Sequence, residues 1–324
     1  MFPRHRIVRS LCLILLVTFF GACARFQIPL NETIREVVLA NDLDSLLQER
    51  EAAFGDITPG AEKTILWART DQAQTEFSVV YLHGFSATRQ ETAPLAEWVA
   101  MELGANLYYP RLTGHGRGGE ALAQATVNDW LNDTVEALEI GQRIGEKVII
   151  MGTSTGGTLA AWLAGSPYAA RVHAYILISP NFGPKDSKAN MLTWPFAQIW
   201  VPWIVGPTRT WEPYSDLNAR YWTWSYPIEA LFPMMGLVEL AREVDPAKMD
   251  TPILIINSPT DTVVDADRTT AFYTGLNVDP RQHIEVLESG DPDNHVLAGD
   301  ILSPETTGTV AEHIVTFLER LDMP

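Results

Sequence analysis

The most informative residues of this chain form the pattern Gly152-x-Ser154-x-Gly156, with a serine between two glycines. An apolar, β-branched run at 147–151 precedes the pattern, and a helix-favouring segment at 158–164 follows it. The order strand, sharp turn, helix would project the serine hydroxyl clear of the backbone, where it can attack a carbonyl carbon. The glycines are needed because a Cβ there would clash with neighbouring elements. The alternative is a glycine-rich turn that only connects a strand to a helix.

A nucleophilic serine needs a histidine as its base and a carboxylate that orients this histidine. Asp261 follows a predicted strand at 252–257, where the carboxylate is expected. Asp265 competes with it, but its position further along is more typical of a loop or cap residue. The loop after the last predicted strand, 284–287, contains His295, which is therefore the predicted base.

Other titratable residues have simpler explanations. His173 and His283 stand beside predicted strands, and His313 lies inside the predicted C-terminal helix, so we expect structural roles for all three. Asp291 and Asp293, close to the predicted base, either raise its pKa or cap a turn.

Cleavage of a carbonyl compound also needs backbone N–H groups that stabilise the negative charge on the carbonyl oxygen. Thr155, directly after the serine, is expected to supply one. Phe85 is expected to supply the second, because it lies in the loop after a predicted strand and Gly84 lets the backbone approach closely. The side chain of His83 is predicted to be structural.

The elements that would position these residues alternate along the chain. Continuous apolar strands alternating with helices are typical of a mostly parallel sheet covered on both faces. The predicted strands are 64–67, 77–83, 106–112, 147–152, 174–179, 252–257 and 284–287, and the predicted helices are 92–103, 127–144, 158–164 and 309–321, with a further helix and linker over 31–51.

Residues 183–247 break this alternation, because no predicted strand separates their helical pieces. The segment holds six of the ten tryptophans: Trp194, Trp200, Trp203, Trp211, Trp222 and Trp224. An aromatic-rich insertion between two strands is typical of a cap, which should leave an apolar pocket. We expect most of these aromatics to pack the insertion onto the core. The predicted organisation is a linker and helix over 23–60, a core over 61–182 and 248–324, and a helical cap over 183–247.

Composition narrows the class of protein. The chain has 324 residues, 46% of them hydrophobic, and a formal net charge of −17. This length is enough for one large core, and an acidic surface disfavours nucleic acid as a partner. The sequence shows no Cys/His spacing of a zinc site, so neither a metal nor an organic cofactor is expected. Oligomeric state cannot be read from the sequence.

Residues 1–22 are predicted to be a signal peptide. Three arginines precede an apolar stretch at 11–20 that is too short to span a membrane comfortably. The residues Phe20-Gly21-Ala22-Cys23 resemble a bacterial lipobox, in which the cysteine becomes the first mature residue and is acylated. The protein would then be tethered in the bacterial cell envelope by lipid. The alternative is a plain secretory signal. No disulfide is expected, since Cys12 leaves with the signal.

Six motifs in the same order resemble the α/β-hydrolase superfamily, and most closely its monoacylglycerol lipase and carboxylesterase branch. They are His83-Gly84-Phe85, Arg111-x-x-Gly114-His115-Gly116, Trp130-x-x-Asp133, Gly152-Thr153-Ser154-Thr155-Gly156-Gly157, Asp261-x-Val263-Val264 and His295-Val296-Leu297. The resemblance covers about residues 62–321 except the cap, and implies the α/β-hydrolase fold. Thr155 departs from the usual Met, Leu or Gln of that branch, which bears on the preferred acyl group.

The ordered serine, aspartate and histidine predict hydrolysis of carboxylic esters through an acyl-enzyme. The tryptophan-rich cap and the membrane tether favour short-to-medium acyl esters, such as monoacylglycerol or lysophospholipid, as the substrates. One alternative is an aminopeptidase or amidase of the same fold. Its acidic pocket for a free amine would come from Glu229, Glu239 and Glu243, although a solvated helix face explains these residues more simply. The other alternative is a non-catalytic, lipid-anchored binding protein, which would require a broken triad.

Overall fold

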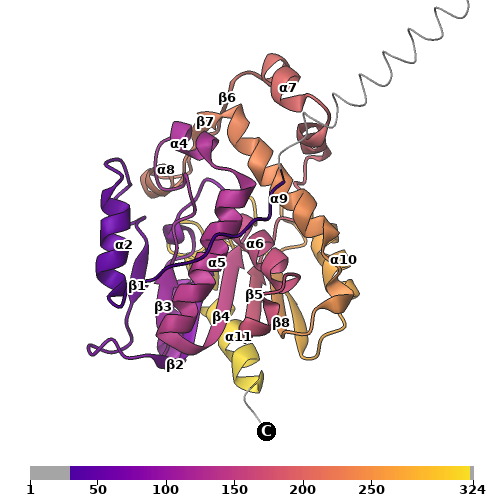
Figure 1. The fold of residues 1–324 in the computed structure, drawn as a ribbon. Coiled ribbons are helices and arrows are strands. Elements are labelled where there is room, and N and C mark those ends of the chain that lie inside the picture. Colours follow the sequence, from indigo (N-terminus) through magenta and orange to yellow (C-terminus); the bar gives the residue numbers. More distant parts are fainter. Residues whose placement is uncertain (1–29, 322–324) are drawn as a thin grey trace, which may run out of the picture.

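The computed structural model describes residues 30–321, so the predicted signal segment and Cys23 lie outside the described residues (Figure 1). The strands of the main sheet are β1 (Thr64–Leu66), β2 (Thr75–Leu82), β3 (Asn106–Tyr109), β4 (Gly145–Thr153), β5 (Ala174–Ile178), β8 (Ile253–Asn257) and β9 (Arg281–Glu285). They form a seven-stranded sheet in the order β1-β3-β2-β4-β5-β8-β9. β1 is antiparallel to β3, and the other neighbouring pairs are parallel.

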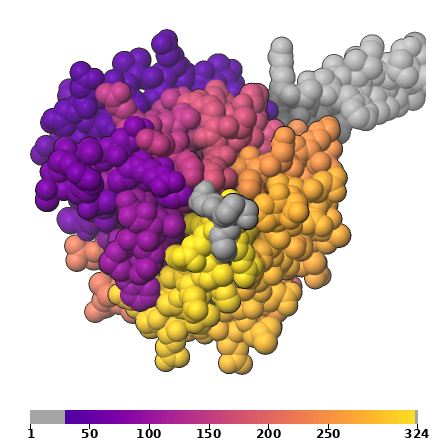
Figure 2. All heavy atoms as spheres, turned by 90° about the horizontal axis from the view of Figure 1, so that it is seen from below, coloured from indigo at the N-terminus to yellow at the C-terminus, as the bar shows by residue number. Residues whose placement is uncertain are grey.

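Helices cover both faces of this sheet. They are α2 (Leu43–Ala52), η1 (Arg89–Glu91), α3 (Leu95–Glu102), α4 (Gly119–Gln124), α5 (Val127–Ile144), α6 (Thr155–Ala164), η2 (Ala169–Arg171), η5 (Pro246–Lys248), α10 (Ala266–Gly275) and α11 (Pro304–Leu321). The apolar sides of α3 and α11 pack on one face, and those of α5, α6 and α10 pack on the other. In Figure 1, α5 and α6 lie in front of the sheet and α11 behind it. Figure 2 shows α11 in yellow on the lower face of the molecule.

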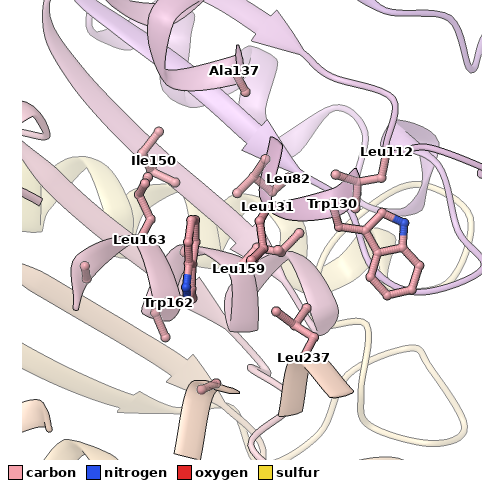
Figure 3. Packing of buried hydrophobic residues seen from close by; sticks show 14 of the residues in the cluster. Leu82, Leu112, Trp130, Leu131, Ala137, Ile150, Leu159, Trp162, Leu163 and Leu237 are labelled. Carbon is pink, nitrogen blue, oxygen red and sulfur yellow. The ribbon is translucent and has the colours of Figure 1, made fainter. Parts of the chain in front are cut away.

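The central strand β4 shows why the sheet is covered twice. Its residues Val148 and Ile150 belong to the apolar cluster beneath α5 and α6, whereas Ile149 and Met151 belong to the cluster beneath α3 and α11. Successive side chains of a strand point to opposite faces, so a continuous apolar run must be buried on both sides. Figure 3 shows Ile150 near Leu163 in the first cluster. The predicted parallel sheet with two helical layers is confirmed.

The sheet has a topological switch at β2. The next strand in sequence, β3, lies on one side of β2, and β4 lies on the other. Ligands of open parallel sheets bind outside the carboxyl ends of the strands at such a switch, where the outgoing loops diverge. β2 leads into His83 and β4 leads into Ser154, so two of the predicted site segments leave the sheet side by side.

Between β5 and β8 lies the predicted cap. Its elements are η3 (Ser187–Thr193), α7 (Ala197–Val205), β6 (Thr208–Thr210), α8 (Asp216–Tyr221), β7 (Ser225–Pro227), η4 (Ile228–Ala230) and α9 (Leu231–Glu243). The expectation that this segment holds no strand is wrong, because β6 and β7 pair as a two-stranded antiparallel sheet. Strands of three residues are too short to show an alternating pattern in the sequence.

The expectation that most of the cap aromatics pack onto the core holds for only part of the tryptophans, since Trp200 and Trp211 pack against buried clusters and three others are exposed. Trp203 is 87% exposed, and Trp194 and Trp224 are 55% and 41% exposed; the other three are half-buried. The packing is provided by α9, whose Met235 and Leu237 are fully buried in the cluster that also contains α6 residues. Composition reveals which residues a segment holds but not which side they face.

The segment before β1 is bound tightly to the core. Residues 30–42 contain no regular secondary structure, and α2 then buries Leu43 and Leu47. Glu51 at the end of α2 pairs with Arg111, with two oxygen–nitrogen distances of 2.8 Å, and both side chains are buried. Over residues 30–321, none of the helices is sufficiently long and apolar to cross a membrane.

Candidate active site

Ser154 stands at the turn between β4 and α6 in a strained backbone conformation, with φ = 53° and ψ = −116°. Such a conformation is uncommon for a residue with a side chain and persists only where the surroundings enforce it. A Cβ on Gly156 would lie 1.9 Å from the carbonyl oxygen of Leu82, and one on Gly152 would lie 2.3 Å from the carbonyl oxygen of Gly156. Both flanking glycines are therefore required by close backbone contacts.

Asp261 and His295 are brought together from two separate loops. His295 Nδ1 donates a hydrogen bond of 2.7 Å to Asp261 Oδ2, while Asp261 Oδ1 accepts the N–H groups of Val263 and Val264 at 2.7 and 2.9 Å. Asp265 instead caps α10 by accepting the N–H of Asp267. The geometry thus pairs His295 with the first of the two candidate acids.

The environment of His295 favours its charged form. Burial alone would lower the pKa of this imidazole, but the charge and hydrogen bond of Asp261, with smaller contributions from Asp291 and Glu91, raise it above the ordinary value of 6.5. With Nδ1 bound to Asp261, Nε2 is the nitrogen available for a proton from a substrate or nucleophile. Neither Ser154 Oγ nor Nε2 makes a hydrogen bond to a residue in the described part of the chain, and such contacts are often long in free enzymes.

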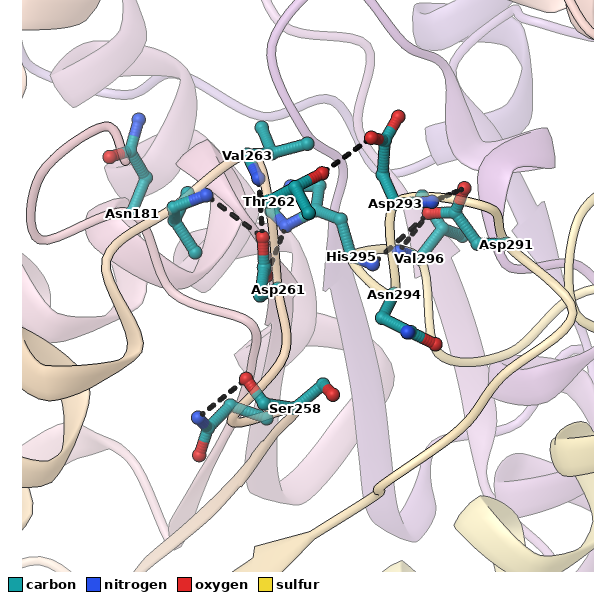
Figure 4. A network of polar contacts seen from close by, with 12 residues as sticks. Asn181, Ser258, Asp261, Thr262, Val263, Asp291, Asp293, Asn294, His295 and Val296 are labelled. Atoms are coloured by element: carbon teal, nitrogen blue, oxygen red, sulfur yellow. Dashed lines mark hydrogen bonds and ion pairs between the residues drawn. The ribbon is translucent and has the colours of Figure 1, made fainter. Parts of the chain in front are cut away.

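The loop after β9 is held by the acids next to His295 (Figure 4). Asp291 Oδ2 accepts the N–H groups of His295 and Val296 at 3.1 and 2.8 Å. Asp293 accepts a hydrogen bond from Thr262, beside Asp261, and one of 2.8 Å from the hydroxyl of Tyr214 in the cap. Both explanations considered for Asp291 therefore apply, since it organises the turn and also raises the pKa of His295.

The two backbone N–H groups expected to stabilise an oxyanion have the right environment. Phe85 follows Gly84 in a turn closed by a 3.3 Å bond from the Ala87 N–H to the Gly84 oxygen. Thr155 is the first residue of α6, and N–H groups in a first helical turn have no intrahelical acceptor. Within residues 30–321, neither N–H donates to another backbone or side-chain group.

The histidine of the 83–87 loop is structural, as its contacts show. His83 is buried, and its Nε2 accepts the Leu112 N–H at 3.1 Å, so Nδ1 carries the proton donated to the Gly84 oxygen at 2.9 Å. Burial lowers the pKa of His83 to about 4. The ring is therefore neutral, and both of its nitrogens have hydrogen-bond partners.

Glu91 is a site residue that the sequence analysis missed. This buried carboxyl accepts hydrogen bonds from the Gly84 N–H and from the hydroxyl of Tyr81, at 2.7 and 2.8 Å. Burial raises its pKa to about 7. In the sequence Glu91 is one acid among 40 Asp and Glu residues, and no pattern around it predicts its burial.

The other charged groups considered do not gather around the serine. Glu229 and Glu243 are exposed, and Glu239 pairs with Arg242 at 2.5 Å. Two hollows of about 430 and 740 Å³ lie elsewhere, the first beside α2 and the second between the ends of α6 and α9. In the described residues, no group of three or more His, Cys, Asp or Glu side chains is arranged to hold a metal ion.

Comparison with known proteins now decides the family. A family model described as serine aminopeptidase, S33, matches residues 73–290, which is more than half of the chain. The chain belongs to this family of α/β-hydrolases. It is also 35% identical over 86 residues to a thermostable monoacylglycerol lipase of Bacillus sp. (strain H-257), an alignment that covers 26% of this chain. The chain thus spans about a third (34%) of the length of that curated relative.

Solved structures confirm the fold of this S33 family member. A structure reported with LipS and LipT, two metagenome-derived lipolytic enzymes, has a TM-score of 0.67 at 22% identity and covers 82% of this chain and 99% of that chain. The monoacylglycerol lipase of Paleococcus ferrophilus has a TM-score of 0.60 at 16% identity, covering 80% and 98% of the two chains. The predicted α/β-hydrolase fold is confirmed.

Proposed function

We propose that the protein hydrolyses carboxylic esters through an acyl-enzyme, with Ser154 as the nucleophile. The observation that carries this proposal is the 2.7 Å bond from His295 Nδ1 to Asp261. It leaves Nε2 as the free nitrogen, at the same edge of the sheet as the strained serine turn. A serine hydrolase requires this arrangement, in which the carboxylate holds one imidazole nitrogen and the other accepts and donates protons.

In the proposed reaction, Ser154 Oγ attacks the ester carbonyl while His295 Nε2 accepts its proton. The carbonyl electron pair moves onto oxygen, and the N–H groups of Phe85 and Thr155 stabilise that oxyanion. When the oxyanion collapses, the bond to the alcohol breaks and His295 donates the proton to the leaving alcohol. Water, activated by the same imidazole, then cleaves the acyl-enzyme. Asp261 fixes the tautomer and stabilises the imidazolium.

The proposed substrates are small acyl esters of short to medium chain length, such as monoacylglycerols or lysophospholipids. The relatives named above include two monoacylglycerol lipases, which supports this class. Thr155 adjoins the proposed nucleophile in the sequence, and its buried hydroxyl has no partner among the described residues.

The decisive experiment is a p-nitrophenyl ester panel of increasing acyl length, run with wild type, Ser154→Ala and Ser179→Ala. Ser179 is the matched control, since it is also a buried serine with positive φ (42°) at the end of a parallel strand. We expect Ser154→Ala to lose at least about a thousandfold in kcat and Ser179→Ala to retain activity. A fluorophosphonate probe should label only Ser154. Wild-type turnover in Ser154→Ala would refute the mechanism.

An aminopeptidase activity is the second candidate, because the matched family model carries that description. Recognition of a free amine needs unpaired acidic groups facing the site. The three cap glutamates do not converge in this way, since one is paired and two are exposed. We therefore expect proline p-nitroanilide to be hydrolysed far more slowly than p-nitrophenyl butyrate. The reverse order of kcat/KM would favour the aminopeptidase.

We also propose that residues 1–22 are removed and that Cys23 is acylated, which would tether the enzyme in the bacterial cell envelope. This proposal rests on the lipobox-like residues before Cys23 alone. Mass spectrometry of the mature N-terminus tests it: a lipid-modified cysteine supports the tether, and an unmodified residue near position 23 supports a secreted form.

A further inference from the structure

A buried carboxyl group with no part in the proposed reaction lies directly behind the serine turn. Glu91 is the last residue of η1 and is 2% exposed. A Cβ placed on Gly84 would stand 2.8 Å from Glu91 Oε2 and 3.3 Å from the Cβ of Ser154. The carboxyl group and the serine therefore flank the same glycine, the residue before Phe85.

One oxygen of this carboxyl group connects two parts of the site. Oε1 accepts the N–H of Gly84 at 2.7 Å and the hydroxyl of Tyr81 at 2.8 Å. The same hydroxyl lies 2.9 Å from Oγ1 of Thr153, the residue before Ser154. A phenol has one proton, so Tyr81 donates to Glu91 and accepts from Thr153. A single chain of hydrogen bonds thus runs from the 83–87 loop to the end of β4.

The direction of the Phe85 N–H depends on how Gly84 is held. The Gly84–Phe85 peptide is trans, so the Phe85 N–H points opposite to the Gly84 carbonyl. That carbonyl accepts hydrogen bonds from His83 Nδ1 at 2.9 Å and from the Ala87 N–H at 3.3 Å. Glu91 secures the other side of the glycine through its N–H. Because glycine has the widest conformational freedom, both anchors are needed to fix this peptide plane.

We infer that Glu91 is a positioning residue, whose hydrogen bond to Gly84 fixes the Phe85 N–H where the oxyanion forms. The inference rests on the proposed function, since it assumes that Phe85 stabilises an oxyanion. Glu91 acts through Gly84 rather than on the substrate. Its loss would weaken binding of the transition state more than binding of the ester.

The positioning bonds do not require a charged carboxylate. Oε1 accepts from both donors whether or not a proton resides on Oε2. Burial raises the pKa of Glu91 to about 7, against the lowering effects of the Gly84 and Tyr81 hydrogen bonds and of His295. Both forms therefore hold the loop near neutral pH, and glutamine, whose amide oxygen can replace Oε1, should be able to replace Glu91.

The test compares Glu91→Met, which removes the acceptor at similar length, with Glu91→Gln, which keeps it. Asp133→Leu is the matched control, because Asp133 is a half-buried carboxyl that also accepts a backbone N–H, that of Thr113 at 2.6 Å, outside the 83–87 loop. For each variant kcat and KM for p-nitrophenyl butyrate are measured, together with the inhibition constant of an alkyl boronic acid, a tetrahedral transition-state analogue. Circular dichroism checks folding.

For Glu91→Met we expect kcat to fall by about 10- to 100-fold, the inhibition constant to rise by a similar factor, and KM to stay within about twofold. Glu91→Gln should recover kcat to within about threefold of wild type. Asp133→Leu should lower the melting temperature and leave kcat unchanged. If Glu91→Met does not fold, Glu91→Asp makes the same test, since it keeps a carboxyl but withdraws it by one methylene.

A folded Glu91→Met enzyme with unchanged kcat and boronate affinity would overturn the inference, as would a loss confined to KM. A Glu91→Gln variant as impaired as Glu91→Met would also overturn it, because the charge and not the acceptor would then matter. Failure of the proposed function looks different: wild type itself would show no ester turnover that depends on Ser154.

Discussion

The loops at the carboxyl edge of the sheet and the cap above them are built in opposite ways. At the sheet edge, Asp261 and Asp291 are nearly inaccessible, and each accepts several hydrogen bonds. In the cap, Trp203 is 87% exposed and the β6–β7 pairing is three residues long. The difference is one of order: hydrogen bonds at the sheet edge hold the side chains of the proposed site in place, whereas the cap presents apolar surface with few contacts of its own.

The largest expected effect is on the acid that orients the histidine. Asp261→Asn should reduce kcat by about 10³- to 10⁴-fold, because the amide cannot hold the same imidazole tautomer. Asp265→Asn should leave kcat unchanged, since Asp265 caps α10. Steady-state kinetics with p-nitrophenyl butyrate measures both. Comparable losses of kcat in the two variants would mean that Asp261 does not specifically orient the imidazole of His295.

The next effect compares a core tryptophan with a cap tryptophan. Trp130 is fully buried and its Nε1 donates to the Thr113 oxygen at 3.0 Å, so Trp130→Ala should lower the free energy of unfolding by about 3–5 kcal/mol. Trp203→Ala removes a side chain that is mostly exposed to water, so it should change the free energy of unfolding by less than about 0.5 kcal/mol. Urea denaturation monitored by circular dichroism measures both. If Trp203→Ala lowered the free energy of unfolding as much as Trp130→Ala does, the cap would be packed as tightly as the core.

A smaller effect concerns the pH dependence of stability. Burial raises the pKa of Glu91 to about 7 from 4.5, so between those values the folded chain keeps a proton that the unfolded chain has released. The free energy of unfolding therefore falls as pH rises through this window. In Glu91→Gln this contribution is absent. From about pH 5 to about pH 8, the melting temperature of the variant should drop by a few degrees less than that of wild type.

The smallest effect is expected where the two regions meet. Tyr214 in the cap donates to Asp293 in the loop after β9 at 2.8 Å, and its pKa is raised to about 12, first by this hydrogen bond. Tyr214 is exposed and Asp293 is half-buried, so Tyr214→Phe should cost less than about 1 kcal/mol and change kcat by no more than about threefold. A larger loss in kcat would show that the cap also helps to position the loop that carries His295.

The sequence was most informative where backbone geometry requires particular residues. Gly152 and Gly156 fill positions that no Cβ could occupy, and the continuous apolar run of β4 required two helical layers. Such constraints dictate the residue types at neighbouring positions, so they leave a recognisable pattern in the sequence. The fold class was predictable for this reason, and so was the meeting of Asp261 with His295 at one edge.

Other features depend on contacts between distant segments and leave no such pattern. Glu91 is buried where it accepts the N–H of Gly84, a contact made by the folded chain, and nothing in the neighbouring sequence marks it as buried. The cap hairpin is too short for alternation, and no sequence pattern shows that α9 supplies the fully buried contacts of the cap while Trp194, Trp203 and Trp224 are exposed. Helices α4 and α10 were also not predicted, and β9 begins three residues before its predicted start.

The buried ion pair of Glu51 and Arg111 limits how far this protein can be shortened from its N-terminal side. Glu51 lies ahead of the region matched by the family model, so a truncation guided by that boundary would remove it. Arg111 would then keep a full charge in an apolar interior with its main partner gone, a loss that typically destabilises by about 3–5 kcal/mol. The practical limit of the folding unit is therefore set by α2, well before the first strand of the sheet.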